Sequence, residues 1–386
     1  MLNWFHMADL HLTARSGPNG EQDYSLAVLA EIFQRAAERQ IDFMLIAGDL
    51  FDTTEDAIAL NPEIRKMSAE LKFPVYWIPG NHDYSRPGKL HSYDWGGLTL
   101  IEQQGWHNLE IREHSIDLLC LPDGCSPSEI PARALTSGQL RLAMAHGIVA
   151  GMAYNGPSEE EGGAPLDPQL FIKQQVHYAA LGHIHGGRME WRKASDSGGM
   201  QVGGGSYQAA GFNGNGTLFV YPGSGRVWRK GESGPRCIVH VSAKLKSDIQ
   251  LRAEMIPLDC AGQFRQLSIP LDLQGGLPDY LPATFENFQH SDRVDAHLSG
   301  LVEDQKQLQD TVRALNEQAN GKVRRLEINT DEVLVLDGVS QEPMVKRFLN
   351  LWEQKKAQSS VNEVEWLRAR ELGLLALKKH LEGGAL

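Results

Sequence analysis

Five short polar clusters in the first half of the chain carry side chains that could bind metal ions. Each cluster directly follows a run of apolar residues. The donors are carboxylates, imidazoles and one amide, and they include no thiolate. Oxygen and nitrogen donors of this kind suit Mn²⁺, Fe²⁺, Zn²⁺ or Mg²⁺ rather than a soft metal ion. The clusters are Asp9-Leu10-His11, Gly48-Asp49-Leu50-Phe51-Asp52, Gly80-Asn81-His82-Asp83, His146-Gly147 and Gly182-His183-Ile184-His185.

Each cluster on its own has a simpler explanation than metal binding. A dipeptide such as Gly48-Asp49 after an apolar run is typical of a turn. A histidine beside an apolar run, such as His146, is more often a hydrogen-bonded core residue than a ligand. His183 and His185 are better candidates, because alternate residues of an extended segment face the same side. The joint presence and the order of the five clusters are what indicate a metal site.

Three apolar runs in the first half of the chain predict strands, at Trp4–Ala8, Phe43–Ala47 and Pro74–Ile78. Apolar residues three and four positions apart predict helices over 24–36 and 58–71, between those strands. Strands without a polar face that alternate with helices indicate an α/β fold with a buried parallel sheet. Because ligand sites gather beyond the carboxyl ends of such strands, the five clusters should meet at one place. Later runs that can extend this architecture are Ile116–Leu121, Leu140–Ala145, Tyr178–Leu181, Thr217–Tyr221 and Cys237–Val241.

The composition changes after the first 245 residues, and residues 246–338 predict a second, smaller α+β unit. Ser291 is a suitable N-cap, and an apolar stripe over Val294–Leu315 predicts one long helix after it. Lys322–Ile328 and Val333–Leu336 predict two short strands. We therefore expect a first domain over 1–245 that carries all five polar clusters.

Residues 339–386 predict a C-terminal region of two amphipathic helices, over 343–357 and 361–381. An apolar stripe on a solvated helix needs a surface that covers it. The two stripes either fold back onto the rest of the chain or bind a partner protein. Their members are Val345, Phe348, Leu349 and Trp352 in the first helix, and Val361, Val364, Leu367, Leu374, Leu377 and Leu381 in the second.

The overall charge limits how this chain could bind nucleic acid. It contains 37 Lys and Arg against 49 Asp and Glu, a net charge of −12. A protein that held nucleic acid through bulk positive charge would be basic, so any such contact must use local patches and metal ions. One basic segment follows the last cluster, although ordinary solvated charges would give the same pattern. Its cations are Arg188, Arg192, Lys193, Arg226, Arg229, Lys230 and Arg236, of which the first three are the candidate DNA contacts, and its acids are Glu190, Asp196 and Glu232.

Four scattered cysteines without a C-x-x-C pair argue against a disulfide framework and against a thiolate zinc site. The first ten residues lack the basic and apolar segments of a secretory signal. The long uncharged window 197–225 contains ten glycines, a composition that does not suit a membrane span. We expect a cytoplasmic protein without a membrane partner.

The ordered clusters resemble the motif set of the calcineurin-like metallophosphoesterase superfamily, which is D-x-H, G-D-x-x-D, G-N-H-D, H and G-H-x-H. The resemblance covers roughly 1–245 and implies a metallophosphoesterase core built as an α+β sandwich. It also implies two divalent ions that act together on a phosphoester. It assigns Asp9, His11 and His185 to one ion and Asn81, His146 and His183 to the other, with Asp49 bridging both.

The same resemblance implies roles for two residues of the third cluster. His82 lies beside Asn81 without being a ligand in the family, so it would stabilise developing charge or protonate the leaving oxygen. Asp83 would either orient His82 or only stabilise the turn.

Three segments are similar to the SbcD-like nuclease branch of that superfamily. They are the second cluster with Thr53, the run Tyr178–His185 followed by Tyr221–Ser224, and Ile256-Pro257-Leu258 at the entry to a capping domain. The similarity implies a DNA exonuclease and endonuclease of repair and recombination that uses two metal ions, with Mn²⁺ favoured over Mg²⁺, Fe²⁺ or Zn²⁺.

The similarity to the SbcD-like branch also implies partners. Residues 246–338 would be the capping domain, and the C-terminal helices would dock on an SbcC-like, SMC-type ATPase. A homodimer is also compatible with the branch. Two alternatives stay open, namely a small-molecule phosphodiesterase or phosphomonoesterase and a catalytically idle scaffold of the ATPase complex.

Overall fold

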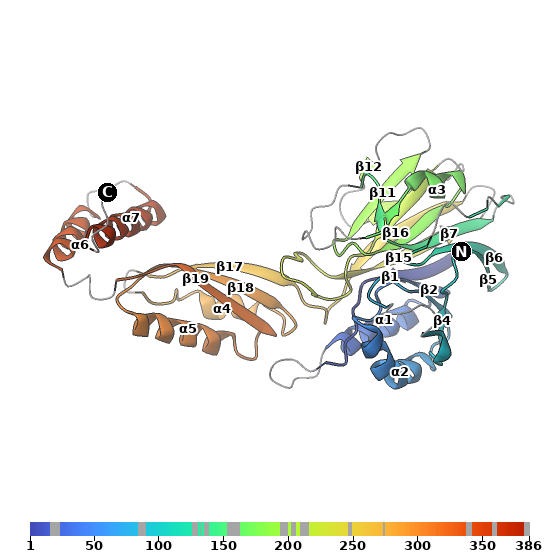
Figure 1. The fold of residues 1–386 in the computed structure, drawn as a ribbon, viewed down its shortest axis with the longest axis horizontal. Coiled ribbons are helices and arrows are strands. Elements are labelled where there is room, and N and C mark those ends of the chain that lie inside the picture. The colour runs from blue at the N-terminus through green and yellow to red at the C-terminus, as the bar shows by residue number, and fades with distance from the viewer. Residues whose placement is uncertain are drawn as a thin grey trace. The chain divides into compact units, whose positions relative to one another are not determined.

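The computed structural model contains two compact units, Met1–Gln263 and Phe264–Leu386 (Figure 1). The residues that it describes are 1–15, 24–83, 90–125, 130–131, 133–134, 139–152, 163–193, 200–201, 206–208, 216–245, 249–272, 275–336, 342–356 and 361–381.

The first unit is built around two seven-stranded sheets. In spatial order the first sheet contains β13 (Ser206–Gln208), β16 (Gln250–Pro257), β15 (Cys237–Lys244), β1 (Leu2–Met7), β2 (Phe43–Ala47), β3 (Val75–Ile78) and β4 (Leu98–Leu100). Strands β1 to β4 pair in parallel, and β15 joins β1 in the antiparallel direction. The carboxyl ends of β1, β2 and β3 therefore lie at one edge of this sheet.

The second sheet supplies two further strands to the same part of the molecule. In spatial order it contains β12 (Met200–Gln201), β11 (Arg188–Lys193), β14 (Gly216–Tyr221), β10 (Tyr178–Gly182), β7 (Leu140–His146), β6 (His114–Leu121) and β5 (Gly105–Ile111). Strands β6, β7, β10 and β14 pair in parallel, and β5 and β11 are antiparallel to their neighbours. Outside the two sheets lie the single turn η1 (Leu90–Ser92) and the short pair β8 (Ile148–Val149) and β9 (Pro165–Leu166).

The two sheets pack face to face and are covered by helices on their outer sides. Trp4 of β1 stacks on Phe43 of β2 with ring centroids 5.3 Å apart and meets Tyr178 of β10 edge-on at 5.7 Å. The helices α1 (Ser25–Glu38) and α2 (Thr54–Ser68) cover the first sheet, and α3 (Pro168–Lys173) covers the second (Figure 1). The result is the α/β sandwich that the sequence predicts.

The predicted strands and helices of the first half are present, with one difference in how the later runs assemble. The sequence predicts that the later apolar runs extend one parallel sheet, whereas β6, β7, β10 and β14 form a second sheet. An apolar run is buried on both faces in either arrangement, because helices or a second sheet can cover it equally well. Helix α2 begins earlier than predicted, because the Thr53 hydroxyl accepts a hydrogen bond from the Asp56 N–H (3.1 Å) and caps it.

The second unit contains a three-stranded parallel sheet of β17 (Phe264–Pro270), β18 (Arg293–Val302) and β19 (Arg325–Val335), in that order. The helices α4 (Leu281–Glu286) and α5 (Gln305–Ala319) lie on one side of it (Figure 1). Their apolar residues form a separate core with Val294, Ala296 and Leu298 of the central strand.

The single helix predicted over Val294–Leu315 is wrong. Its first part is strand β18, and α5 begins only after Asp304, whose carboxylate accepts from the Gln307 N–H (2.8 Å). Val294 and Leu298 are four residues apart, as in a helix, but Ala296 between them also faces the core, as in a strand. The two predicted short strands likewise form the single strand β19.

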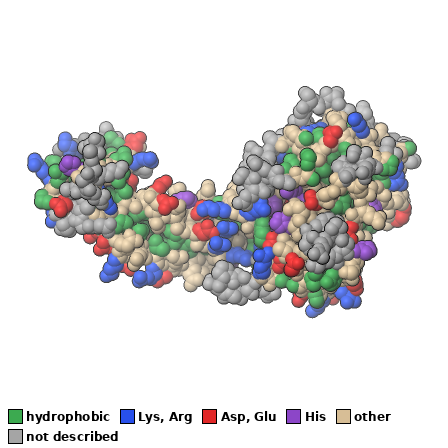
Figure 2. Space-filling view, in the orientation of Figure 1, with side chains coloured by type: hydrophobic (Ala, Val, Ile, Leu, Met, Phe, Trp, Pro, Cys, Tyr) green, Lys and Arg blue, Asp and Glu red, His purple; other side chains and the backbone are tan. Residues whose placement is uncertain are grey.

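The two predicted C-terminal helices are present as α6 (Pro343–Lys356) and α7 (Glu363–Leu381). Part of their apolar stripes is buried, because Val345 and Leu374 pack with Leu301 and Leu336 in a small core within the second unit. Figure 2 shows apolar side chains among charged ones on the visible face of these helices. Met344, Leu351 and Leu372 on these helices, and Val361 just before α7, are apolar residues that are each about half exposed or more.

The first unit extends past the predicted boundary at residue 245 and ends at Gln263. The reason is that β16 pairs with β15 along its whole length, so it belongs to the first sheet. The second predicted boundary, between 338 and 339, lies outside the described residues. Among the described residues, no helix has both the length and the apolarity needed to cross a membrane. The four cysteines are free.

Candidate metal centre

The first two clusters lie side by side because the loops after β1 and β2 are hydrogen-bonded to each other. The Asp9 N–H donates to the Gly48 carbonyl and the His11 N–H to the Asp49 carbonyl, both at 3.1 Å. Asp9, His11 and Asp49 have positive φ angles of 53°, 47° and 50°, and His183 has 95°. Non-glycine residues rarely adopt this conformation, and strain of this kind gathers at functional sites.

Two glycines leave the space that these side chains occupy. A Cβ atom on Gly48 would collide with the His146 ring, and one on Gly80 would collide with the Asp49 carboxylate. Gly48 also has a φ of +91°, which disfavours any side chain there. The glycines of the second and third clusters are therefore needed for close approach and not only for turns.

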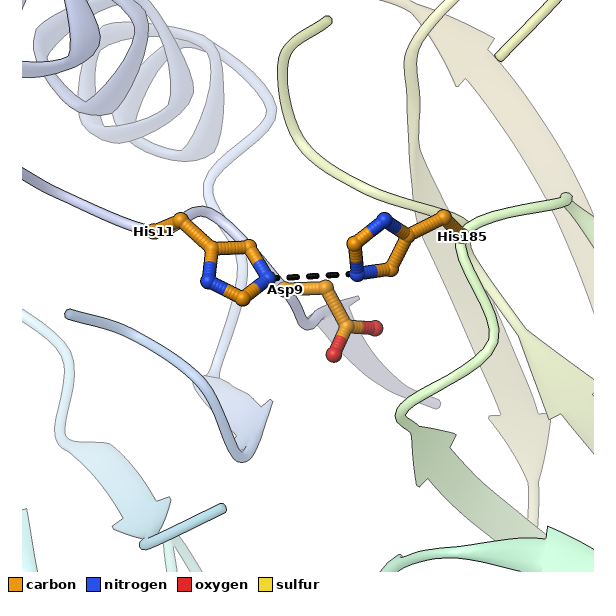
Figure 3. A group of neighbouring side chains, drawn as sticks. All are labelled: Asp9, His11 and His185. Carbon is orange, nitrogen blue, oxygen red and sulfur yellow. Dashed lines mark hydrogen bonds between the residues drawn. The ribbon is translucent and has the colours of Figure 1, made fainter. Parts of the chain in front are cut away.

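Asp9, His11 and His185 converge from the ends of β1 and β10 (Figure 3). The Nε2 atoms of the two imidazoles lie 3.1 Å apart. One Asp9 oxygen accepts from the His183 N–H at 2.8 Å, while its Oδ2 is buried without a hydrogen-bond partner among the described residues. A carboxylate oxygen and two imidazole nitrogens thus face one small volume.

Asn81, His146 and His183 form a second group from the ends of β3, β7 and β10. The Asn81 Oδ1 lies 3.0 Å from the His146 Nε2 and 3.2 Å from the His183 Nδ1. Asp49 stands between the two groups, because its Oδ2 is 3.4 Å from the His146 Nε2 and 3.9 Å from the His11 Nε2. The structure therefore brings all seven predicted ligands together.

Burial and neighbouring charges shift the pKa values of the buried side chains of this site. Burial raises the pKa of Asp9 to about 7. Burial lowers the pKa of His146, but the Asp49 charge overcomes it and raises the value to about 10. The pKa of Asp49 is in turn lowered by His146 despite its own burial. His146 and Asp49 thus stabilise each other's charged forms.

The residues present fit a pair of divalent cations. The donors are oxygen and imidazole nitrogen, which divalent ions of the Mn, Fe and Zn type accept. Three sets of side chains each have one possible ligand atom per residue within 4.8 Å of the others. They are Asp9 with His11 and His185, Asp9 with Asp49 and His146, and His11 with Asp49 and His82. The buried Asp9 Oδ2, which has no hydrogen-bond partner among the described residues, is a polar atom that a bound metal ion would satisfy.

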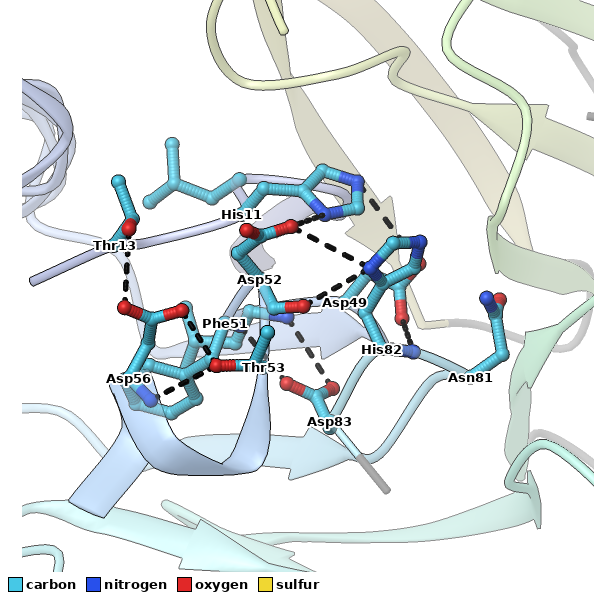
Figure 4. Close-up of polar contacts among 12 residues, drawn as sticks. His11, Thr13, Asp49, Phe51, Asp52, Thr53, Asp56, Asn81, His82 and Asp83 are labelled. Atoms are coloured by element: carbon cyan, nitrogen blue, oxygen red, sulfur yellow. Dashed lines mark hydrogen bonds and ion pairs between the residues drawn. The ribbon is translucent and has the colours of Figure 1, made fainter. Parts of the chain in front are cut away.

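His82 is held at the edge of this site and points toward Asp52 (Figure 4). Its Nδ1 lies 3.0 Å from the Asp52 carbonyl and 3.5 Å from the Asp52 carboxylate. The hydrogen bond to Asp52 raises the pKa of His82 to about 9. The side chain is 28% exposed, whereas that of His11 is fully buried. His82 can therefore reach a bound molecule from solvent.

Asp83 has a different task from its neighbour. Its carboxylate accepts hydrogen bonds from the backbone N–H groups of Phe51 and Gly80, both at 2.9 Å, and of Leu50 at 3.3 Å. It thereby ties the third cluster to the second. Of the two roles considered for Asp83, the contacts support the turn-stabilising one, and the residue that orients His82 is Asp52.

The comparison with protein families decides what kind of domain carries this geometry. The calcineurin-like phosphoesterase family matches residues 3–187, which contain all five clusters. This segment is a calcineurin-like phosphoesterase domain. The family predicted from the motifs is thus confirmed, and its members use a dinuclear metal site. The phosphoesterase domain implies hydrolysis of a phosphoester.

Two curated relatives are each similar to about half of the chain. The DNA double-strand break repair protein Mre11 of Saccharolobus solfataricus is 25% identical over 210 residues, which are 51% of this chain and 52% of that protein. The uncharacterized metallophosphoesterase YhaO of Bacillus subtilis is 24% identical over 206 residues, 48% of each. The chain therefore spans about half the length of the curated relatives it matches.

Among solved structures, a dimetal phosphatase from Danio rerio shares 12% identity with a TM-score of 0.37, and the match covers 67% of this chain and 99% of that one.

Sequence reasoning missed two acidic residues around the phosphoesterase centre. Asp52 was part of the second cluster, and its place three residues after Asp49 was the available signal. No sequence signal pointed to Glu232, because it lies in the loop between β14 and β15 and contacts His185, which is far away along the chain. Its Oε1 is 2.6 Å from the His185 Nδ1.

Most cations of the basic segment are buried or half-buried in the first unit. Arg192 is buried, and its Nε donates to the Glu190 carboxylate at 2.6 Å and its Nη1 to the Ala150 carbonyl at 2.7 Å. Arg188 is half-buried, with its Nη2 3.6 Å from the same carboxylate, while Lys193 is exposed. Arg192 therefore does not lie on a surface that DNA could reach, contrary to the prediction.

Of the remaining cations of the basic segment, two are buried, Arg229 is half-buried and Lys230 is exposed. Arg226 is buried and donates to the Leu10 carbonyl at 2.9 Å, and Arg236 is buried with its Nη1 3.6 Å from Glu232. Asp196, which entered the charge count, lies outside the described residues. The sequence could not reveal this pairing, because burial of an arginine depends on contacts far along the chain.

Proposed function

We propose that the chain is a metal-dependent DNA exonuclease and endonuclease that hydrolyses phosphodiester bonds at the site beyond β1, β2, β3, β7 and β10. The observation that carries the proposal is the position of Asp49 between two donor groups. A carboxylate shared in this way is suited to hold two ions at once. The similarity to Mre11, whose name places it in double-strand break repair, favours DNA as the substrate.

In this proposal the two donor groups hold one ion each. Asp9, His11 and His185 would hold the first and Asn81, His146 and His183 the second, with Asp49 binding both. A pair of divalent ions, most simply Mn²⁺, supplies a water of lowered pKa and stabilises charge on both oxygens of the bond that breaks.

His82 would act on the substrate and not on the ions. Asp52 fixes the ring through Nδ1, which leaves Nε2 directed away from that contact. A protonated imidazole there can stabilise negative charge on the phosphate or give its proton to the leaving oxygen. Asp52 keeps the ring oriented and favours the protonated form, because its hydrogen bond raises the pKa of His82 to about 9.

The tail helices and the second unit would serve partners in the cytoplasm. Leu351 and Leu372 are 51% and 60% exposed, and apolar residues of this size on a helix surface suit a protein interface. We propose that α6 and α7 dock on an SMC-type, SbcC-like ATPase and that residues 264–336 cap the DNA. Of the three predicted DNA contacts, Lys193 has an exposed side chain, and we propose it as a phosphate contact.

A second candidate is a phosphoesterase for small molecules. YhaO, which carries only the description of an uncharacterized metallophosphoesterase, is as similar to this chain as Mre11 is. A catalytically idle scaffold is a third reading, and the complete donor set argues against it.

A direct assay separates the three. The full-length protein is incubated with Mn²⁺ and end-labelled single- and double-stranded DNA, beside bis-p-nitrophenyl phosphate. The nuclease predicts cleavage of DNA that stops when the ions are chelated. Cleavage of the small diester alone would favour the small-molecule enzyme, and no cleavage of either by protein loaded with Mn²⁺ would favour the scaffold.

A further inference from the structure

Glu232 is a buried carboxylate whose position is fixed from several sides. Its Oε1 faces the His185 Nδ1 at 2.6 Å. Its Oε2 accepts from the Trp228 N–H at 2.8 Å and from the Ser224 hydroxyl at 3.2 Å. The Arg236 guanidinium lies 3.6 Å from the same oxygen. These contacts hold the Glu232 carboxylate in one orientation, with Oε1 facing His185.

The contact decides which nitrogen of His185 can bind an ion. A carboxylate that accepts at Nδ1 requires the proton to be on that nitrogen, which leaves the lone pair on Nε2. The His185 Nε2 is the atom that lies 3.1 Å from the His11 Nε2, inside the first donor group. Without Glu232 the ring could rotate, or could carry its proton on the wrong nitrogen.

In the other donor group, His146 faces a backbone carbonyl where His185 faces a carboxylate. The His146 Nδ1 is 3.0 Å from the Ala47 carbonyl, which is a neutral acceptor. A carbonyl fixes the tautomer as a carboxylate does, but it adds no negative charge to the ring. His185 and His146 therefore differ in the charge of the acceptor that faces the Nδ1 atom of each ring.

We propose that Glu232 is a positioning residue that fixes the orientation and tautomer of His185 and thereby sets the affinity of the Asp9–His11–His185 group for its ion. The inference rests on the proposed metal centre. It assigns Glu232 to one of the two ions and predicts that the other ion does not depend on it.

The competing explanation is that Glu232 only holds its loop together. Its bonds to Ser224 and to the Trp228 N–H would suffice for that role. Ser224→Ala is the matched control, because it removes one loop contact of Glu232 and leaves the bond to His185 in place. The Ser224 hydroxyl also donates to the Arg226 carbonyl at 2.9 Å, so the control perturbs the same loop.

The test measures Mn²⁺ binding to the full-length protein by calorimetry, with the melting temperature recorded for each variant. Glu232→Ala should weaken one of two sites by about 10–100-fold, the usual cost of losing a group behind a metal ligand, and leave the second unchanged. Glu232→Gln should weaken the same site less, because an amide oxygen still accepts from Nδ1 without the charge. If Glu232→Ala does not fold, Glu232→Gln carries the test.

A second measurement does not need the metal. Long-range ¹H–¹⁵N spectra of the metal-free protein should show His185 with its proton on Nδ1 in the wild type and a mixture of tautomers in Glu232→Ala. The proposal would be overturned if Glu232→Ala left both the Mn²⁺ affinity and the His185 tautomer unchanged. It would also be overturned if Ser224→Ala lost as much metal affinity as Glu232→Ala. Wild-type protein that binds no ion would instead overturn the proposed function, and the spectra would still decide whether Glu232 fixes the tautomer.

Discussion

The candidate metal centre of the first unit and the tail helices of the second unit differ in the kind of side chain that they bury and expose. The centre buries charged and polar groups, among them an Asp9 oxygen without a hydrogen-bond partner among the described residues. The tail exposes large apolar groups such as Leu351 and Leu372. Buried charge is compensated by an opposite charge, whereas exposed apolar surface is compensated by contact. In our proposal the first region therefore binds ions and the second a partner protein.

The largest effect should come from removing the carboxylate shared by both donor groups. We expect Asp49→Ala to abolish hydrolysis of DNA and of bis-p-nitrophenyl phosphate together, because both ions lose a ligand. Asp94→Ala, which removes an exposed carboxylate paired with Arg65, is the control and should be fully active. Substantial turnover by Asp49→Ala at ordinary Mn²⁺ concentrations would show that the centre does not depend on a shared ligand.

A smaller loss is expected at His82, which touches the substrate in our account. His82→Ala should lower the single-turnover rate by about 10²–10⁴-fold, the usual contribution of a general acid or base. Its Mn²⁺ affinity should stay that of the wild type, because the donor groups are intact. His91→Ala, at an imidazole that is 79% exposed, serves as the control. Recovery of the rate by excess Mn²⁺ would mean that His82 supports a ligand instead.

A modest effect is expected from the one exposed cation of the predicted DNA contacts. Lys193→Ala should reduce the slope of log affinity for DNA against log salt concentration by about one, as expected for the loss of one phosphate contact. Lys173→Ala, on α3, is exposed as well and should leave the slope unchanged. Identical slopes for wild type and Lys193→Ala would remove Lys193 from the DNA path.

The smallest effect on catalysis is expected in the tail. Replacing Leu351 and Leu372 together by Glu should leave hydrolysis of the small diester unchanged and abolish co-purification with the ATPase. The control introduces the same charges at Gln354 and Ala369, which are exposed and carry no large apolar side chain. Retained co-purification of the Leu351 and Leu372 variant would contradict the docking role.

These two regions also differ in how far the sequence predicts them. The convergence of the five clusters was predictable, because each follows a strand and parallel strands end at a common edge. The choice of seven donors among their side chains came from the resemblance to the calcineurin-like family. The support behind these donors was not predictable, since Glu232 reaches His185 only through the folded loop before β15. In the second unit, the periodicity around Val294 and Leu298 fitted a helix and a strand equally, and pairing with β17 and β19 decides for the strand.

The most direct test of the metal centre is anomalous X-ray diffraction at the manganese edge from crystals of the full-length protein grown with Mn²⁺. The account predicts two peaks, one among Asp9, His11 and His185 and one among the second donor group, with the Asp49 carboxylate in contact with both. A single peak, or two peaks of which Asp49 touches only one, would contradict it.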